Sequence, residues 1–168
     1  METIERSLVL LKPDTLERGL VGEILQRFER VGFKIVGLKL LKPTREHAEG
    51  HYTEELAARR GDHVRNYMIE SLTSGLVVAI VLEGVEAVEV IRKMIGETQP
   101  KQALPGTIRG DYGHISFKHT DTSETKDFFN LIHASASLEE ANQEIAVWFK
   151  EEELVDHEPI YTKHTITK

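Results

Sequence analysis

The distribution of apolar residues along the chain predicts short strands alternating with longer helices. From Leu20 to Val31, apolar side chains recur every three to four residues, which predicts a helix that ends at Gly32. Ser7 to Leu11 is a short apolar run typical of a buried strand. Lys12-Pro13-Asp14 ends this strand, because proline has no N–H for the sheet and favours a turn. Lys12 is therefore expected at the end of a strand.

The rest of the chain continues this alternation. Leu76 to Leu82 is a nearly continuous aliphatic run with three valines, the pattern of a strand buried on both faces. Ser137 and Glu140 form a capping-box pattern that should start a helix through Trp148. The other expected elements are a strand at 33–41, two short helices within 45–74 that begin after Thr44, a helix at 85–95 and a strand around 114–117.

The order of these elements predicts the fold class. It fits an α+β fold, the ferredoxin-like split β-α-β sandwich, in which a four-stranded antiparallel sheet carries helices packed on one face. Residues 1–168 contain no internal repeat, and no linker rich in proline or serine divides them. Since 40% of the residues are hydrophobic, a chain of this length can build one core, and we expect a single domain.

Composition and charge narrow the classes of function. The formal net charge of −7 repels polyanions, so neither nucleic acid nor a membrane surface is expected as a partner. A phosphate ligand would then need a local basic pocket. The absence of cysteine excludes disulfides, thiolate catalysis and cysteine-ligated zinc. The apolar run at 8–11 is too short for a signal peptide or a membrane span, so we expect a cytoplasmic protein.

Four short segments combine basic, hydroxyl, amide and glycine residues in a way that suggests a phosphate site. Lysine offers a mobile charge, arginine a planar fork for phosphate oxygens, and glycine a close approach of the backbone. Taken alone, each of these residues is more commonly a solvated surface residue or a turn residue. The segments are Lys12-Pro13-Asp14, Arg92 with Gly96-Glu97-Thr98, Pro105 to Asp111, and Asn130 to His133.

In combination, these segments make the chain resemble the nucleoside diphosphate kinase family from near its start to about Val155. Six ordered motifs carry the resemblance, and their order makes it specific. They are K-P-D at 12–14, R-G-L-V-G-E at 18–23, H-Y at 51–52, G-E-T-Q-P at 96–100, P-G-T-I-R-G-D at 105–111 and N-L-I-H-A-S at 130–135. The resemblance implies one kinase domain over 1–168, with 156–168 as a C-terminal extension.

The family resemblance implies a two-step, ping-pong transfer through a phosphohistidine. His133 would accept the γ-phosphoryl group of a nucleoside triphosphate and pass it to a nucleoside diphosphate. A neutral imidazole nitrogen suits this role because it is nucleophilic near pH 7. Mg²⁺ would arrive on the nucleotide phosphates, with no direct metal ligand from the protein, and help stabilise charge on the transferred group. The implied substrates are nucleoside tri- and diphosphates such as ATP, GTP, ADP and GDP.

The same resemblance implies roles for the residues around His133. Arg92, Thr98 and Arg109 would hold the phosphates, while Lys12 and Asn130 would meet the sugar hydroxyl and the phosphate side of the nucleotide. The three remaining assignments are Tyr52, which would support the lysine; Glu144, which would orient the histidine through its other ring nitrogen; and Ser135, which would assist Glu144.

The sequence departs from the family pattern in two places. Counting forward from His51-Tyr52, Arg60 falls where the family has an aromatic residue that stacks on the base, whereas counting back from Ser74-Gly75 points to Val64. A guanidinium can also stack, so Arg60 is included among the nucleotide-binding residues. A polar insert at 119–127 predicts a surface loop, and the spacing of His114 and His119 matches no zinc pattern.

Two other interpretations remain open from the residues alone. A non-catalytic nucleotide-binding module would keep the fold, and a ferredoxin-like hydrolase of the acylphosphatase type would leave His133 without a covalent task. The resemblance also implies a homo-oligomer, commonly a hexamer and sometimes a tetramer, with the residues after Val155 contributing to subunit contacts.

Overall fold

A computed structural model describes residues 4–124 and 127–165. Four strands form one antiparallel sheet in the order β2-β3-β1-β4. This order confirms the ferredoxin-like α+β fold, because the strands next to each other in the sheet are those that the split β-α-β topology brings together. The strands are β1 (Ile4–Leu11), β2 (Lys34–Leu41), β3 (Val77–Val85) and β4 (Ile132–Ala134).

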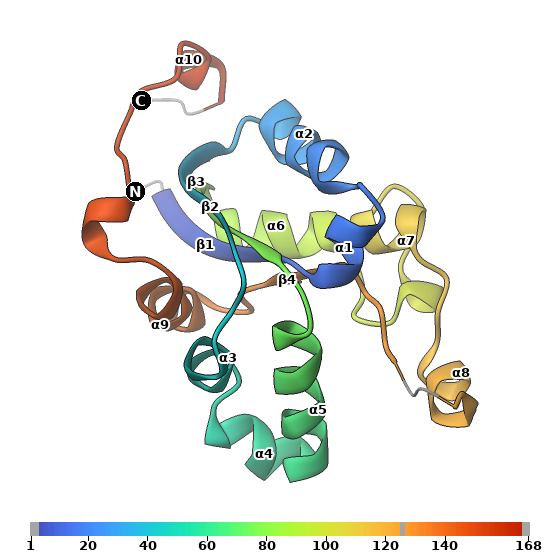
Figure 1. Cartoon of the computed structure of the whole chain (residues 1–168). Coiled ribbons are helices and arrows are strands. Elements are labelled where there is room, and N and C mark those ends of the chain that lie inside the picture. Colours follow the sequence, from blue (N-terminus) through green and yellow to red (C-terminus); the bar gives the residue numbers. More distant parts are fainter. Residues whose placement is uncertain (1–3, 125–126, 166–168) are drawn as a thin grey trace.

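Helices connect these strands (Figure 1). Two of the predicted ends are formed as expected: Gly32 ends α2 with a left-handed φ of 97°, and Ser137 accepts a hydrogen bond from the Glu140 N–H at the start of α9. The helices are α1 (Pro13–Glu17), α2 (Val21–Val31), α3 (Arg45–His51), α4 (Glu54–Arg60), α5 (Asp62–Thr73), α6 (Ala87–Ile95), α7 (Ile108–Tyr112), α8 (Phe117–Thr122), α9 (Leu138–Trp148) and α10 (Thr162–Thr165), with 3-10 turns at Pro100–Gln102 and Glu151–Glu153.

Helices cover both faces of the sheet, so the expectation of helices on one face was wrong. Leu8 and Leu10 of β1 pack with α3, α5 and α9, whereas Val9 and Leu11 pack with α2 and α6. Figure 1 shows the two groups of helices on opposite sides of the strands. Because successive side chains of a strand point to opposite faces, the continuous apolar runs of β1 and β3 require cover on both sides.

The fourth strand is not at 114–117, as the alternating pattern predicted, but at β4. Ile115 does not join the sheet; its carbonyl accepts a hydrogen bond from the Lys101 N–H. The Ser116 hydroxyl caps α8 by accepting from the His119 N–H. The true strand escaped detection because it has only three residues and contains a histidine, too little for a period of two to emerge.

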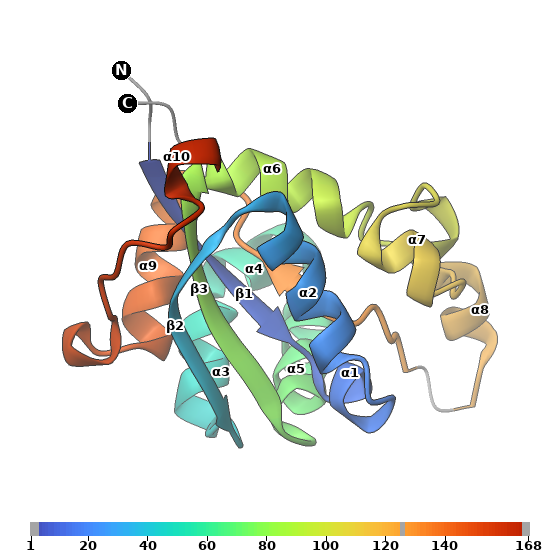
Figure 2. The same cartoon turned by 90° about the horizontal axis from the view of Figure 1, so that it is seen from above.

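Two polar regions have more helix than the sequence predicted. The stretch from Arg45 to Thr73 forms three helices, α3 to α5, where two were expected. The insert at 119–127 is not only a loop, because its first part lies in α8, while residues 125 and 126 lie outside the described part of the chain. Figures 1 and 2 show α7 and α8 projecting together to one side of the sheet.

The segment after α9 returns along the outer edge of β2 (Figure 2). The Val155 N–H donates to the Val36 carbonyl, and His157 Nε2 lies 2.9 Å from the Ile35 carbonyl oxygen. Lys34 forms an ion pair with Asp156 at 2.6 Å. Within the described residues, no helix is both long and apolar enough to cross a membrane.

Candidate active site

His133 lies in the middle of β4, where it pairs with Leu10 of β1. The residue that leads into this strand, Leu131, has a φ of 69°, a left-handed conformation that costs energy for a residue with a branched side chain. The Asp14 carboxylate accepts from the Leu131 N–H at 3.0 Å, and the Thr15 hydroxyl donates to its carbonyl at 2.6 Å. The K-P-D turn after β1 therefore holds the backbone that presents His133.

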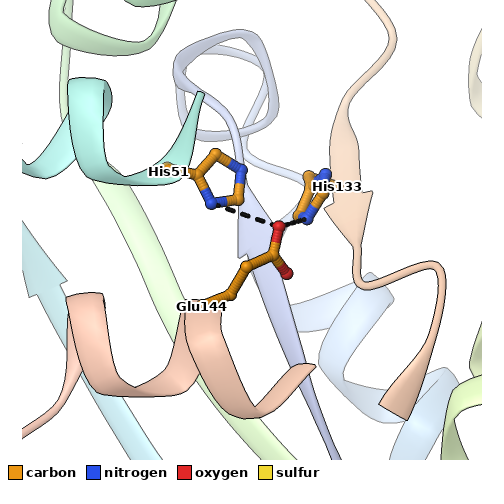
Figure 3. Close-up of side chains that lie close together, drawn as sticks. All are labelled: His51, His133 and Glu144. Atoms are coloured by element: carbon orange, nitrogen blue, oxygen red, sulfur yellow. Dashed lines mark ion pairs between the residues drawn. The ribbon is translucent and has the colours of Figure 1, made fainter. Parts of the chain in front are cut away.

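The two ring nitrogens of His133 have different surroundings. Nε2 is buried and lies 2.8 Å from Glu144 Oε1, although the ring N–H does not point straight at that oxygen. The side chain keeps 21% of its surface exposed, so the exposed part lies on the other side of the ring. Figure 3 shows Nδ1 pointing away from Glu144. This geometry leaves Nδ1 as the nitrogen that can meet a ligand.

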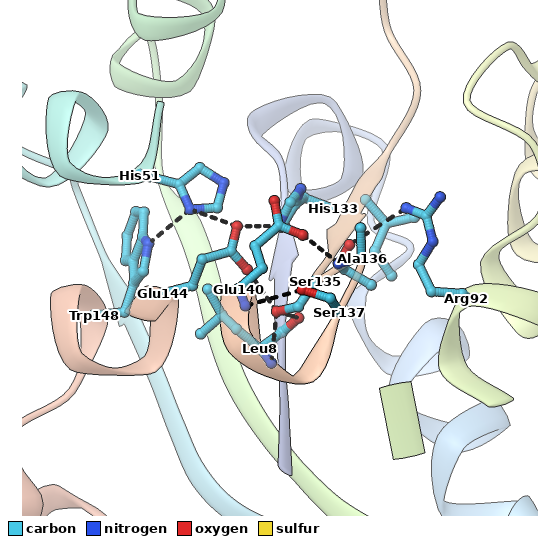
Figure 4. Close-up of polar contacts among 12 residues, drawn as sticks. Leu8, His51, Arg92, His133, Ser135, Ala136, Ser137, Glu140, Glu144 and Trp148 are labelled. Atoms are coloured by element: carbon cyan, nitrogen blue, oxygen red, sulfur yellow. Dashed lines mark hydrogen bonds and ion pairs between the residues drawn. The ribbon is translucent and has the colours of Figure 1, made fainter. Parts of the chain in front are cut away.

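Glu144 belongs to a buried network that joins β4, α3 and α9 (Figures 3 and 4). Its Oε2 accepts from the Ser135 hydroxyl at 2.5 Å, and its Oε1 lies 3.3 Å from His51 Nδ1 as well as near His133. The indole N–H of Trp148 donates to His51 Nδ1 at 3.4 Å. Burial raises the pKa of Glu144, while His51 and the Ser135 hydroxyl oppose that rise.

Cations approach His133 from the opposite side. Lys12 Nζ donates to Asn130 Oδ1 at 2.7 Å, and Asn130 Nδ2 donates to the Thr98 carbonyl at 3.0 Å. Arg92 lies on α6, and its Nη1 donates to the Ala134 carbonyl oxygen at 3.5 Å. In Figure 4, His133 lies between Glu144 and Arg92.

Arg109 is buried and organises the backbone around the histidine. Its guanidinium donates from Nη1 to Gly96 at 2.9 Å, from Nε to Asn130 at 3.2 Å and from Nη2 to Ile132 at 2.5 Å, each time to the carbonyl oxygen. These bonds tie the segment after α6 to the entry of β4. Nη1 and Nη2 each keep a second N–H that these three bonds do not use.

The electrostatic field of the site favours a neutral histidine and an anionic ligand. Burial lowers the pKa of His133 to about 3, and the positive charge of Lys12 is the next largest cause. Burial likewise lowers the pKa of Lys12 to about 8, with repulsion from Arg109 second, and the pKa of Arg109 to about 10, with repulsion from Arg92 second. An anion bound among these three cations would relieve their mutual repulsion.

The structure therefore brings together most of the predicted site residues. His133, Lys12, Asn130, Arg109 and Arg92 converge, and Ser135 contacts Glu144 as predicted. Thr98 is exposed and adjoins this group through its carbonyl.

Tyr52 is buried, and its ring meets that of His51 edge to face at 4.7 Å. Burial and the nearby Glu144 raise its pKa. Arg60 is exposed at the end of α4, whereas Val64 is half-buried in α5.

Three contributors to the site received no role from the sequence: His51, Trp148 and Asp14. His51 lies in the H-Y motif and Asp14 in the K-P-D motif, but the motifs do not predict which groups these two side chains contact. A further signal is spacing, because Glu144 and Trp148 are four residues apart in α9 and therefore share one face of the helix.

His51, His133 and Glu144 have the donor types of a transition-metal site, and their ligand atoms lie within 4.8 Å of one another. They are the only such group within the described residues. However, the Trp148 N–H donates to His51 Nδ1. A metal ion bound at Nδ1 would leave this buried N–H without an acceptor and next to a positive charge. The cluster is better explained as a buried polar network beside His133, in which Ser135 donates to Glu144 and Trp148 donates to His51.

Fold and site together define a class of protein: an α+β phosphotransferase in which a histidine on the shortest strand faces a pocket of cations. Comparisons with known proteins agree. The family model for nucleoside diphosphate kinase matches residues 5–154. A nucleoside diphosphate kinase from Pyrococcus furiosus is 47% identical over 157 residues, covering 94% of this chain and 90% of that protein. One from Thermus thermophilus is 49% identical over 152 residues, covering 90% of this chain and 100% of its own.

Solved structures give the same result. The nucleoside-diphosphate kinase from Borrelia burgdorferi, a transition state mimic with bound vanadate and ADP, superposes with a TM-score of 0.92 at 39% identity and covers 96% of both chains. A halophilic nucleoside diphosphate kinase from Halobacterium salinarum, in complex with CDP, has a TM-score of 0.82 at 36% identity, covering 97% of this chain and 99% of that one. The chain belongs to the nucleoside diphosphate kinase family and is a phosphotransferase.

Proposed function

We propose that this enzyme transfers the γ-phosphoryl group of a nucleoside triphosphate to a nucleoside diphosphate, with His133 Nδ1 as the atom that carries it. One observation supports this most directly: Nε2 of His133 is buried beside Glu144, while Nδ1 points away from that carboxylate (Figure 3). A ring held in this way has one nitrogen occupied and the other available for attack.

The proposed transfer has two steps. The Nδ1 lone pair attacks the γ-phosphorus in line, an N–P bond forms, and the P–O bond to the diphosphate breaks with its electron pair leaving on that oxygen. The ring then carries a positive charge, which the neighbouring Glu144 carboxylate stabilises. In the second step, a terminal oxygen of another diphosphate attacks the phosphorus, and the N–P bond breaks to restore neutral His133.

The surrounding cations would stabilise charge on the phosphoryl oxygens. Arg92 and Arg109 supply planar guanidinium groups, Lys12 supplies a point charge, and Thr98 and Asn130 supply polar groups. Tyr52 would support Lys12, and Ser135 would keep Glu144 in place. The Tyr52 assignment rests on the match to the family motifs alone, and the others rest on that match and on the contacts described above.

Mg²⁺ fits this site as a companion of the nucleotide. The two carboxylates beside His133 are already engaged, Glu144 by the Ser135 hydroxyl and Glu140 by the Ala136 N–H, and the cluster around His133 is rich in nitrogen, which Mg²⁺ does not prefer. The ion would therefore be held by the substrate phosphates and would neutralise part of their charge.

The substrates would include ATP, GTP, ADP and GDP, because the proposed contacts address phosphates and sugar. The ADP and CDP bound to the two related structures support this breadth. We further propose one domain over 1–168 with 156–168 as a C-terminal extension, a cytoplasmic location, and a homo-oligomer, with a hexamer favoured over a tetramer. Sedimentation or light scattering measures the assembly directly.

The function is tested by incubating the protein with Mg²⁺ and ATP labelled at the γ-phosphorus. The expected product is an acid-labile phosphoprotein that ADP or GDP discharges within seconds. Acid-stable label, or label that no diphosphate removes, would contradict the ping-pong scheme. Release of labelled inorganic phosphate without a phosphoprotein would indicate a hydrolase instead.

The pH dependence of kcat/KM should show a fall at alkaline pH. It should not show the fall near pH 6.5 that an ordinary histidine nucleophile would give. Because the pKa of His133 is lowered to about 3, the nucleophile stays neutral and kcat/KM should be flat through pH 6.5. Because the pKa of Lys12 is lowered to about 8, its charge is present below that pH and lost above it, so kcat/KM should fall as pH rises through 8. Steady-state kinetics from pH 5.5 to 9.5 measure both the flat region and the alkaline fall.

Lys12→Arg is the control for this profile. Arginine remains charged throughout the range, so the variant should lose the alkaline limb even if its overall rate is lower. An alkaline limb unchanged in Lys12→Arg would assign that ionisation to another group.

Arg60→Phe tests the departure from the family pattern. Arg60 is exposed at the end of α4, so an aromatic ring there should alter only base stacking. We expect a change in nucleotide KM of about threefold or less and an unchanged kcat, since stacking contributes on the order of 1 kcal/mol or less at an exposed position. A large loss of kcat would contradict this prediction and indicate that Arg60 takes part in catalysis. Val64→Ala provides the comparison at the alternative position.

A further inference from the structure

His51 makes contacts that none of the roles above uses. Its side chain is completely buried, and its Nδ1 lies 3.3 Å from Glu144 Oε1, the same oxygen that lies 2.8 Å from His133 Nε2. The rings of His51 and His133 meet edge to face, with centroids 4.4 Å apart and planes at 86° (Figure 3). Two imidazoles thus share one carboxylate oxygen and also touch each other.

The tautomer of His51 follows from its neighbour Trp148. The indole N–H, which can only donate, points at His51 Nδ1, so Nδ1 accepts and the ring proton resides on Nε2. Burial lowers the pKa of His51 to about 3, with the repulsion that a protonated His133 would exert as the next cause, so the ring stays neutral. His47, one turn earlier in α3, stacks on Trp148 with centroids 5.4 Å apart.

These contacts restrict how His133 can move. The edge of the His51 ring blocks rotation of the His133 ring toward α3, and its Nδ1 borders the Glu144 oxygen that faces His133 Nε2. Without this ring, water could enter beside Glu144 and compete for His133 Nε2. Because transfer requires Nδ1 in line with the phosphorus, a small rotation of the ring would slow the reaction strongly.

We propose that His51 is a positioning residue for phosphoryl transfer: a neutral second imidazole that, locked by Trp148, packs against Glu144 and the His133 ring and so confines that ring to the orientation that exposes Nδ1. This inference rests on the proposed function of His133. His51 acts through Glu144 and His133 and does not contact the nucleotide phosphates, so it should affect the rate of phosphorylation and not nucleotide affinity.

The first test examines the wild-type protein and needs no variant. With ¹⁵N-labelled histidine, two-bond ¹H–¹⁵N NMR spectra report which ring nitrogen carries the proton. We expect the proton on Nε2 of both His51 and His133 between pH 6 and 8. A proton on Nδ1 of His51 would overturn the proposal, because Trp148 could then not act as its donor.

The second test measures single-turnover labelling by ATP in two variants. His51→Leu keeps an apolar side chain of similar bulk but loses Nδ1, and it should lower the labelling rate about 10-fold or more, with KM for ATP changed by about twofold or less. In this variant His133 should also show mixed tautomers. His51→Asn places a polar atom near the former Nδ1 position and should recover much of the rate.

Trp148→Phe and His47→Leu separate positioning from packing. Trp148→Phe keeps an aromatic ring but removes the N–H, so His51 should lose its single tautomer and the rate should fall. His47→Leu removes a ring that stacks on Trp148 without touching Glu144, and it should leave the rate unchanged.

If His51→Leu does not fold, the wild-type spectra and Trp148→Phe decide the question. Folded His51→Leu and Trp148→Phe proteins that label at the wild-type rate would overturn the proposal. A wild-type protein that takes no label would instead refute the proposed function.

Discussion

His133→Ala should take no label from ATP and should lose turnover by about 10⁴-fold or more, because the covalent intermediate has no other acceptor. The other described histidine in this cluster, His51, points both of its ring nitrogens into the protein, where they are buried against Trp148 and Glu144 or have no partner. It therefore cannot substitute as nucleophile. A coupled assay of ATP formation and acid-labile labelling measure the two effects independently.

Two further variants make this result interpretable. His133→Gln places an amide near the position of Nε2, so it can satisfy Glu144 while lacking Nδ1, and it should be as inactive as His133→Ala but more stable. His119→Ala removes an exposed histidine of α8 and should label normally. Substantial turnover in His133→Gln would reject Nδ1 as the atom that carries the phosphoryl group.

Arg109→Leu should reduce both stability and activity, and the two losses have separate causes. The buried guanidinium donates to the carbonyls of Gly96, Asn130 and Ile132, and its loss leaves three acceptors without their donor. At roughly 1–3 kcal/mol for each buried group left unsatisfied, and with relaxation recovering part of this, we expect about 3–5 kcal/mol of destabilisation. Loss of a cation at the phosphates should lower kcat about 10²-fold or more.

Arg92→Leu is the matched control, because Arg92 is exposed and makes a single long contact at 3.5 Å. It should change the free energy of unfolding by about 0.5 kcal/mol or less, while still weakening the enzyme's hold on nucleotide phosphates. Urea denaturation measures the stability of both variants, and steady-state kinetics measure their activity. If Arg109→Leu were as stable as Arg92→Leu, the three carbonyl bonds would not contribute to stability.

The local patterns were sufficient to predict most of the secondary structure. The apolar spacing of α2, its glycine cap and the aliphatic runs of β1 and β3 appear in the fold close to where the sequence predicted them. The prediction failed where the local signal was short or misleading. The run at 114–117 alternates like a strand, but Ser116 caps a helix there, and the three-residue strand β4 becomes visible only once β1 provides its partner.

The site shows the same division. The motif matches predicted that His133 and the groups around it belong to one site, but not which atoms each residue uses in its contacts. Arg109, expected to hold phosphates, also holds three backbone carbonyls, and Asp14 supports the left-handed Leu131. Such roles depend on which carbonyl or N–H lies opposite a side chain, and this follows from tertiary packing.

By itself, the sequence determined the fold class and the family, because residue types and periodic spacing are local properties of a chain. Only the tertiary structure decided that β4 is the fourth strand and that His51 and His133 share one oxygen of Glu144. The physical reason is distance along the chain: α3, β4 and α9 meet only after the sheet has assembled, so no local pattern could encode their contacts.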